Sequence, residues 1–240
     1  MSKDIRIKKG LNINLVGAAE QTTSKAVLSN VYAIQLSDFH GITPKMIVKQ
    51  GAEVKAGEPL FYNKNMRDML FVSPVSGELV EIERGDRRRI LTLKILADKT
   101  QEAFAGAALD VEKASKGELK AALLKSGCWP FIKQRPYDVI ANPDATPKSI
   151  FISGYSSAPL QADLDYVLQG KEKELQAAIT ALGKLTPGKV HVAVSGSGNS
   201  PLTSLKGIEL HKVSGPHPAG LVGTHISKLD PINKGETVWT

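Results

Sequence analysis

Short apolar runs separated by polar and turn residues fill the first hundred positions of the chain. Alternating apolar and polar residues predict strands at 3–8, 30–36, 70–72, 77–83 and 90–96. Glycines and prolines punctuate these runs, among them Gly51, Gly57, Pro74 and Gly77. Glycine supplies the backbone angles of tight turns, and β-branched residues fit half-buried strands. Residues 1–102 are therefore predicted to be a β-rich region.

The hydrophobic pattern acquires helical spacing after that point. Residues 117–125 put Leu119, Ala122 and Leu123 on one face of a helix, and Ser115 is placed to cap its N-terminus. A longer helical stretch, 160–182, is divided in two at Gly170.

Continuous apolar runs alternate with these helices and predict buried strands at 149–153, 189–194 and 207–213. This order of elements is typical of an α/β layer with a parallel sheet. We therefore expect an α+β or α/β protein, with the β-rich region followed by a Rossmann-like domain over residues 103–240.

Composition adds few constraints. The chain has 240 residues, 42% of them hydrophobic and 23% charged, which is ordinary for a soluble globular protein. Its first residues lack the apolar stretch of a secretory signal, and no run approaches the ~20 apolar residues of a membrane span. Strand-like sequence runs to Thr240 without a polar tail, so we expect a chain cut in mid-protein.

Cysteine and histidine usage predicts no metal site. Cys128 is the sole cysteine, and the five histidines show neither HExxH nor CxxC spacing. His191 lies in an apolar strand, where a buried, hydrogen-bonded histidine is the expected outcome. No serine, cysteine or carboxylate constellation predicts a catalytic site.

The net charge of +7 raises the question of nucleic acid. The densest basic run, residues 84–89, falls between two predicted strands and has no interleaved aromatic residues, so it is expected to be a solvated hairpin turn. No nucleic-acid partner is predicted. The remaining alternative is a positive edge that meets an acidic partner or anionic lipid headgroups.

Two further segments are candidate ligand-binding loops. Residues 194–201 follow a strand and contain Gly196 and Gly198, but Pro201 stands where the dinucleotide fingerprint needs a third glycine. We expect a turn that holds no phosphate. The loop Trp129-Pro130-Phe131 offers two large aromatics that either form an apolar ledge for a flat ring or cap the domain core.

The glycine-punctuated segment 47–82 is similar to the biotinyl/lipoyl-carrier fold, a flattened barrel that presents a modifiable lysine at a hairpin tip. The resemblance implies a barrel-sandwich module over about residues 43–96. Met66 occupies the position of the modified lysine, and Lys64 lies two residues away. We therefore expect no covalent carrier group.

The string Ser214-Gly215-Pro216-His217-Pro218-Ala219-Gly220, followed by Gly223-Thr224-His225 and Leu229-Asp230-Pro231, resembles the A subunit of the sodium-translocating NADH:quinone reductases. The resemblance covers the whole chain. It implies a peripheral subunit on the cytoplasmic face of the bacterial inner membrane, with the other subunits as partners. It also implies that NADH, flavins, an iron–sulfur cluster and ubiquinone are used elsewhere in the complex, and that this chain is an N-terminal fragment.

The same architecture resembles the flavin-binding subunit of respiratory complex I, which binds flavin with a glycine-rich loop. Here residues 126–133 keep one glycine and fill the space with bulky side chains, so no redox cofactor is expected. Any ubiquinone contact is expected at Trp129 and Phe131, with Lys133 or His217 near the ring carbonyls. The alternative is a degenerate carrier-type or flavin- and NADH-binding electron-transfer module.

Overall fold

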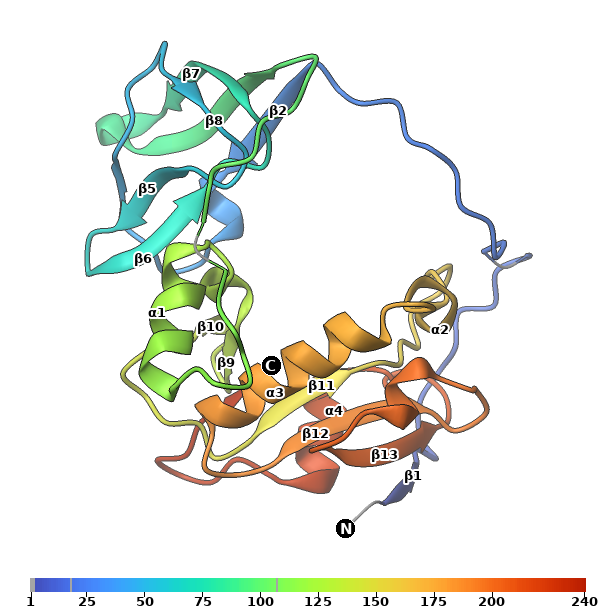
Figure 1. Cartoon of the computed structure of the whole chain (residues 1–240). Helices are drawn as coiled ribbons and strands as arrows, with labels where there is room; N and C mark the ends of the chain where they lie inside the picture. The colour runs from blue at the N-terminus through green and yellow to red at the C-terminus, as the bar shows by residue number, and fades with distance from the viewer. Residues whose placement is uncertain (1–2, 18, 107) are drawn as a thin grey trace.

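The computed structural model describes residues 3–17, 19–106 and 108–240. Figure 1 shows two modules, a β-rich one built from two small sheets and an α/β one built on a larger sheet, with α1 between them. The longest described helix, α3, has 14 residues. No helix of the described ranges is long and apolar enough to cross a membrane.

The β-rich module packs two antiparallel sheets face to face. The first has the order β2-β8-β7-β4 and the second β3-β5-β6. Their side chains form a dry core that includes Leu60, Phe61, Leu79, Leu93 and Ile95, all fully buried. The strands are β2 (Val31–Gln35), β3 (Pro44–Met46), β4 (Glu53–Val54), β5 (Pro59–Asn63), β6 (Met66–Val72), β7 (Gly77–Arg84) and β8 (Ile90–Ala97).

The α/β module is built on a seven-stranded sheet of order β1-β13-β12-β11-β14-β9-β10. The first five strands of this order run parallel, and β9 and β10 extend the sheet antiparallel. Its strands are β1 (Asp4–Arg6), β9 (Lys133–Arg135), β10 (Val139–Ile140), β11 (Ile150–Ser153), β12 (Val190–Ser195), β13 (Glu209–Ser214) and β14 (Val238–Trp239).

Helices cover both faces of this sheet. On one face Ile150 and Val192 share a core with Ile179 and Leu185 of α3. On the other, Phe151, the next residue of β11, packs with Ile226 of α4. The helices are α1 (Lys116–Lys125), α2 (Leu164–Val167), α3 (Glu172–Leu185) and α4 (Val222–Leu229), with short 3₁₀ turns η1 (Leu36–Asp38), η2 (Asp86–Arg88), η3 (Trp129–Phe131) and η4 (Pro201–Ser204).

Local signals in the sequence placed most of these elements correctly. Ser115 caps α1 through a capping box in which its hydroxyl accepts from the N–H of Glu118 and its own N–H donates to the Glu118 carboxylate. Gly170, with φ of +73°, separates α2 from α3 as predicted.

The first strand is the exception. Residues 1–102 were predicted to be one β-rich region, but β1 pairs parallel with β13, with Asp4 opposite Lys212. β1 therefore belongs to the sheet of the α/β module. The strand itself was predicted, but sequence alternation identifies a strand without identifying its partner, which here lies about 200 positions away.

A long connection, residues 8–30 and hereafter the strap, links β1 to β2 and follows the open side of the molecule (Figure 1). Few interactions hold its described residues. The Leu11 N–H donates to the His217 carbonyl at 3.0 Å, and the Gln21 amide donates to Asp163 at 2.6 Å. Its large apolar side chains, including Ile13 and Val27, are exposed.

Two glycine-to-alanine substitutions should change stability in opposite directions. Gly77 begins β7 with φ of +149°, and a Cβ there would collide with the Leu96 carbonyl of β8. Gly77→Ala should lower the free energy of unfolding by at least about 2 kcal/mol. Gly117 lies in the first turn of α1, where a Cβ meets only the Ser115 hydroxyl at 4.0 Å.

Gly117→Ala should therefore be stabilising by about 0.5–1 kcal/mol. Urea unfolding curves of the two variants and the wild type measure both effects. Equal midpoints for Gly77→Ala and wild type would contradict the close approach of β7 to β8.

Candidate functional site

The segment that follows α1 joins the two modules. Gly127 ends the helix with φ of +74°, and a Cβ added there would lie 2.7 Å from the Val72 side chain of β6. The next residues form η3, which also contacts β6. This joint is therefore made by backbone packed directly against the β-rich module, and it leaves no room for a side chain at residue 127.

Trp129 lies inside the joint. It is fully buried, and its indole N–H donates to the Ala141 carbonyl at 2.8 Å. Its ring meets that of Trp239 edge to face, with centroids 5.4 Å apart. The expected quinone contact by Trp129 does not fit this placement, because no surface of the side chain is open to a ligand. Of the two predicted roles, capping the core is the one the structure supports.

Phe131, two residues on, points the other way. It is 74% exposed and borders an apolar cavity of about 330 Å³ between η3 and the β-rich module. Phe39, Phe71, Val72, Pro74 and Pro130 line the same cavity. Two polar residues, Gln35 and Asp38, also reach its wall. This volume and lining are typical of a small-molecule site.

The other two predicted contact residues lie elsewhere. Lys133 begins β9, where its backbone exchanges hydrogen bonds with that of Thr240, and it does not line the cavity. His217 follows β13, four strand spacings from β9 in the sheet, which places the two strands roughly 19 Å apart. The structure therefore does not bring His217 together with Trp129 and Phe131.

His217 instead belongs to a clasp formed by residues 215–220 at the end of β13. Its Nδ1 lies 3.0 Å from the Ser157 hydroxyl, which also accepts from the N–H of Gly220 at 2.8 Å. The His217 N–H donates to the Asn12 side chain of the strap at 2.8 Å. The clasp therefore holds the loop after β11 and the start of the strap at the carboxyl end of β13.

A second histidine supports this clasp from α4. His225 is 1% exposed, and its Nε2 lies 2.7 Å from the Ala219 carbonyl. Burial lowers the pKa of His225, so the ring is neutral and Nε2 carries the donated proton. The unusual string 214–225 thus has a packing role that the sequence did not reveal, because Asn12 and Ser157 are remote in the chain.

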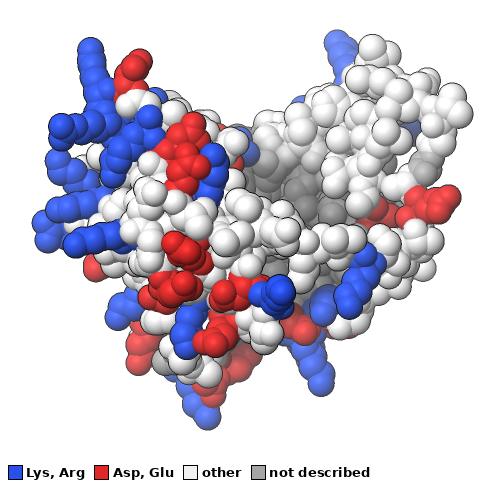
Figure 2. All heavy atoms as spheres, turned by 90° about the horizontal axis from the view of Figure 1, so that it is seen from above, with Lys and Arg blue, Asp and Glu red and all other residues white. Residues whose placement is uncertain are grey.

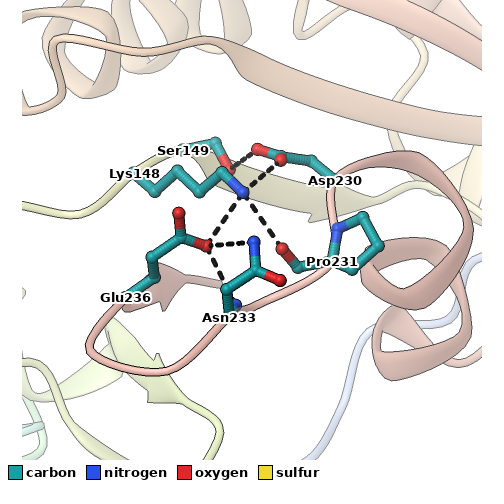
Figure 3. A network of polar contacts seen from close by, with 6 residues as sticks. All are labelled: Lys148, Ser149, Asp230, Pro231, Asn233 and Glu236. Atoms are coloured by element: carbon teal, nitrogen blue, oxygen red, sulfur yellow. Dashed lines mark hydrogen bonds and ion pairs between the residues drawn. The ribbon is translucent and has the colours of Figure 1, made fainter.

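Asp230 and Pro231, from the other part of that family string, contribute to an ion-pair cluster (Figure 3). The Lys148 ammonium contacts Asp230 at 2.7 Å, Glu236 at 2.9 Å and the Pro231 carbonyl at 3.0 Å. Hydrogen bonds to Asp230 and Glu236 raise the pKa of Lys148. The Asn233 N–H, and after it Lys148, lowers the pKa of Glu236. Burial opposes ionisation of Asp230, but hydrogen bonds from Lys148 and Ser149 outweigh it and lower the Asp230 pKa. The cluster fixes the loop between α4 and β14 against the start of β11.

His191, predicted to be a buried strand histidine, forms a pair with His211 of β13. His191 Nδ1 lies 3.0 Å from His211 Nε2, and His211 Nδ1 accepts from the Lys3 N–H at 3.2 Å. These contacts are satisfied when both rings are neutral, with His211 donating through Nε2. Burial lowers the pKa of His191. Burial and, after it, the neighbouring His191 imidazole lower the pKa of His211 to about 4.

The hairpin and loop proposed from the carrier and nucleotide patterns can also be located. Lys64 is exposed in the turn between β5 and β6, and Met66 is the first residue of β6, packed partly against the core.

In the loop after β12, the Ser197 N–H donates to the Ser195 hydroxyl, and Pro201 is the first residue of η4. These serines line a cavity of about 510 Å³ with Arg6 and Lys212. Over the described ranges, no group of three or more histidines, cysteines or carboxylates is placed to hold a metal ion.

Two family models account for nearly the whole chain. One, described as the NqrA N-terminal barrel-sandwich hybrid domain, matches residues 5–98. The other, described as the NqrA second alpha/beta domain, matches residues 114–240. The chain belongs to the NqrA family. The predicted order, a barrel-sandwich module and then an α/β domain, is thereby confirmed, as is the resemblance stated from the sequence.

Individual relatives agree with this assignment. Proteins named as the A subunit of the Na(+)-translocating NADH-quinone reductase are similar along 98% of the chain, with 34% identity in Neisseria meningitidis, 36% in Tolumonas auensis and 32% in a Marinomonas species. The chain spans 53% of the length of each. Their names describe one component of an oxidoreductase complex, as the resemblance implied.

Truncation of the two aromatics of η3 should separate packing from exposure. Trp129→Ala removes a buried ring and leaves the Ala141 carbonyl unpaired, so it should cost about 3–5 kcal/mol of stability. Phe131→Ala removes a ring that is 74% exposed and should change the free energy of unfolding by less than about 1 kcal/mol. Denaturant titration followed by tryptophan fluorescence and circular dichroism gives both values. A small loss of stability in Trp129→Ala would contradict the packing of this side chain in the joint.

The histidine pair should make the protein less stable in mild acid. Unfolded histidines bind protons near pH 6.5, whereas folded His211 does so only near pH 4. Between these values the unfolded state binds more protons, so stability falls as the pH falls. Replacing His211 with Gln should reduce this loss by about 2–3 kcal/mol between pH 7 and pH 4, while the exposed His40→Gln should leave it unchanged. Unfolding free energies at a series of pH values measure the slope, and equal slopes in all three proteins would contradict the assignment.

Proposed function

We propose that this protein is a peripheral subunit of a sodium-translocating NADH:ubiquinone reductase, placed on the cytoplasmic face of the inner membrane and bound to the other subunits. The proposal includes the absence of a redox cofactor in this chain. NADH oxidation, flavin and iron–sulfur chemistry and sodium export then belong to its partners. Support comes from the family membership over both domains and from relatives named for that complex.

The joint between the modules supports the cofactor-free part of the proposal. In the flavin-binding proteins that the chain resembles, a glycine-rich loop lets a phosphate approach the backbone. Here the corresponding segment is occupied by Trp129, whose ring fills the joint and whose N–H is already paired. Its single glycine, Gly127, faces Val72. A phosphate that approaches this segment therefore meets no run of glycines.

The observation that supports a quinone contact is the apolar cavity beside Phe131. A quinone offers a flat apolar face and two acceptor oxygens, so its site needs an apolar wall and one or two donors. Phe39, Phe71 and Phe131 provide the wall, and the Gln35 amide is a donor on the same cavity. Ubiquinone contact is therefore proposed at this cavity, with Trp129 supporting the wall from the core side.

A photoreactive ubiquinone analogue tests the contact in the purified complex. The peptide that contains Phe131 should be labelled, and Phe131→Ala should reduce labelling by about tenfold because the stacking surface is lost. Tyr137→Ala is a matched control, since Tyr137 is an 82% exposed aromatic outside the cavity. Labelling confined to the other subunits would refute the contact. Flavin absorbance in the purified chain would refute the cofactor-free role.

A further inference from the structure

The β7–β8 hairpin ends in a turn of unusual composition. The Arg89 N–H donates to the Asp86 carbonyl at 3.1 Å, which closes a four-residue turn over Asp86–Arg89. Its two central residues, Arg87 and Arg88, have φ of +55° and +61°. Left-handed angles at both central positions define a type I′ turn, in which Asn-Gly is strongly preferred because side chains with a Cβ are strained there.

Arginine at both positions therefore makes the turn less stable than Asn-Gly would, and folding of the hairpin does not require it. Strained backbone of this kind persists where the surrounding structure and a function maintain it. Here it holds Arg87, Arg88 and Arg89 together at the outermost end of the hairpin, all exposed. The Arg84 guanidinium is fixed beside them, because its Nη1 donates to the Arg88 carbonyl at 3.1 Å.

The carboxylates nearest in sequence do not neutralise these arginines. Lys94 of β8 pairs with Glu81 at 2.9 Å and lies 3.9 Å from Glu83. Across the described residues, no ion pair joins Arg84, Arg87, Arg88 or Arg89 to a carboxylate. Figure 2 shows Lys and Arg side chains gathered at the same side of the β-rich module, on the left of the view.

We propose that this arginine tip, residues 84 and 87–89, docks an acidic segment of another protein. The inference rests on the proposed function, since the complex supplies the partner. Guanidinium groups carried together on one turn suit the paired oxygens of carboxylates. An anionic bilayer binds any exposed cluster of basic side chains, so it would not need the strained turn. The observations therefore favour a protein partner over a lipid surface.

A double variant separates docking from folding. Arg87→Asn with Arg88→Gly restores the preferred turn sequence, so the midpoint of thermal unfolding should rise by about 2–4 °C. Binding to membranes that contain the other subunits and lack this one should fall by at least about tenfold. Lys64→Asn with Arg67→Asn removes the same charge from the exposed β5–β6 hairpin and should leave binding unchanged.

Co-sedimentation at about 50 mM and about 300 mM NaCl measures binding, which should weaken with salt for the wild type and much less for the tip variant. Protein-free vesicles with anionic phosphatidylglycerol provide the lipid arm. Equal binding of wild type and tip variant to the subunit-containing membranes would overturn the docking role alone. If the wild type binds protein-free vesicles as strongly as it binds the subunit-containing membranes, the tip is assigned to lipid. No wild-type binding to any membrane would overturn the proposed function together with this interface.

Discussion

The position of Trp129 is the constraint on which the two-module architecture depends. The ring lies in one continuous apolar core that runs from Leu93 and Ile95 of the β-rich module to Val190 and Val192 of the α/β sheet. Its single polar atom is paired with Ala141, so burial of the indole leaves no unsatisfied donor on that ring. Because α1 and η3 lie outside the β-rich module and contact its strand β6, the orientation of one module relative to the other is fixed where this side chain packs.

How much the sequence revealed depends on the distance over which each signal acts. The α1 cap, the Gly170 break and the strands β2, β7 and β8 are set by neighbours a few residues apart, and they were predicted. The partner of β1 and the clasp around His217 depend on residues 60 to 208 positions away, and they were not. The two aromatics of η3 show most clearly what the sequence does not predict. Trp129 is fully buried and Phe131 is 74% exposed, yet both are large aromatic residues in the same short loop.

Several residues that identify the family here serve to hold loops. His217, His225 and Asp230 each hold a loop in place through a hydrogen bond or an ion pair. None of these residues lines the cavity beside Phe131. A distinctive string is therefore compatible with an architectural role, in which it fixes loops. The arginine tip lies on the β-rich module, and the cavity lies between that module and η3.

The pairing of β1 with β13 also sets an order of events during synthesis. The seven strands of the barrel-sandwich all lie between residues 31 and 97 and pair only with one another. That module has its complete set of partners as soon as this stretch leaves the ribosome. β1 is made earlier, yet its partner lies 208 positions downstream. At a translation rate of about 5–20 residues per second, β1 remains unpaired for roughly 10–40 s after its synthesis. The α/β sheet is therefore completed after all strands of the β-rich module have been made.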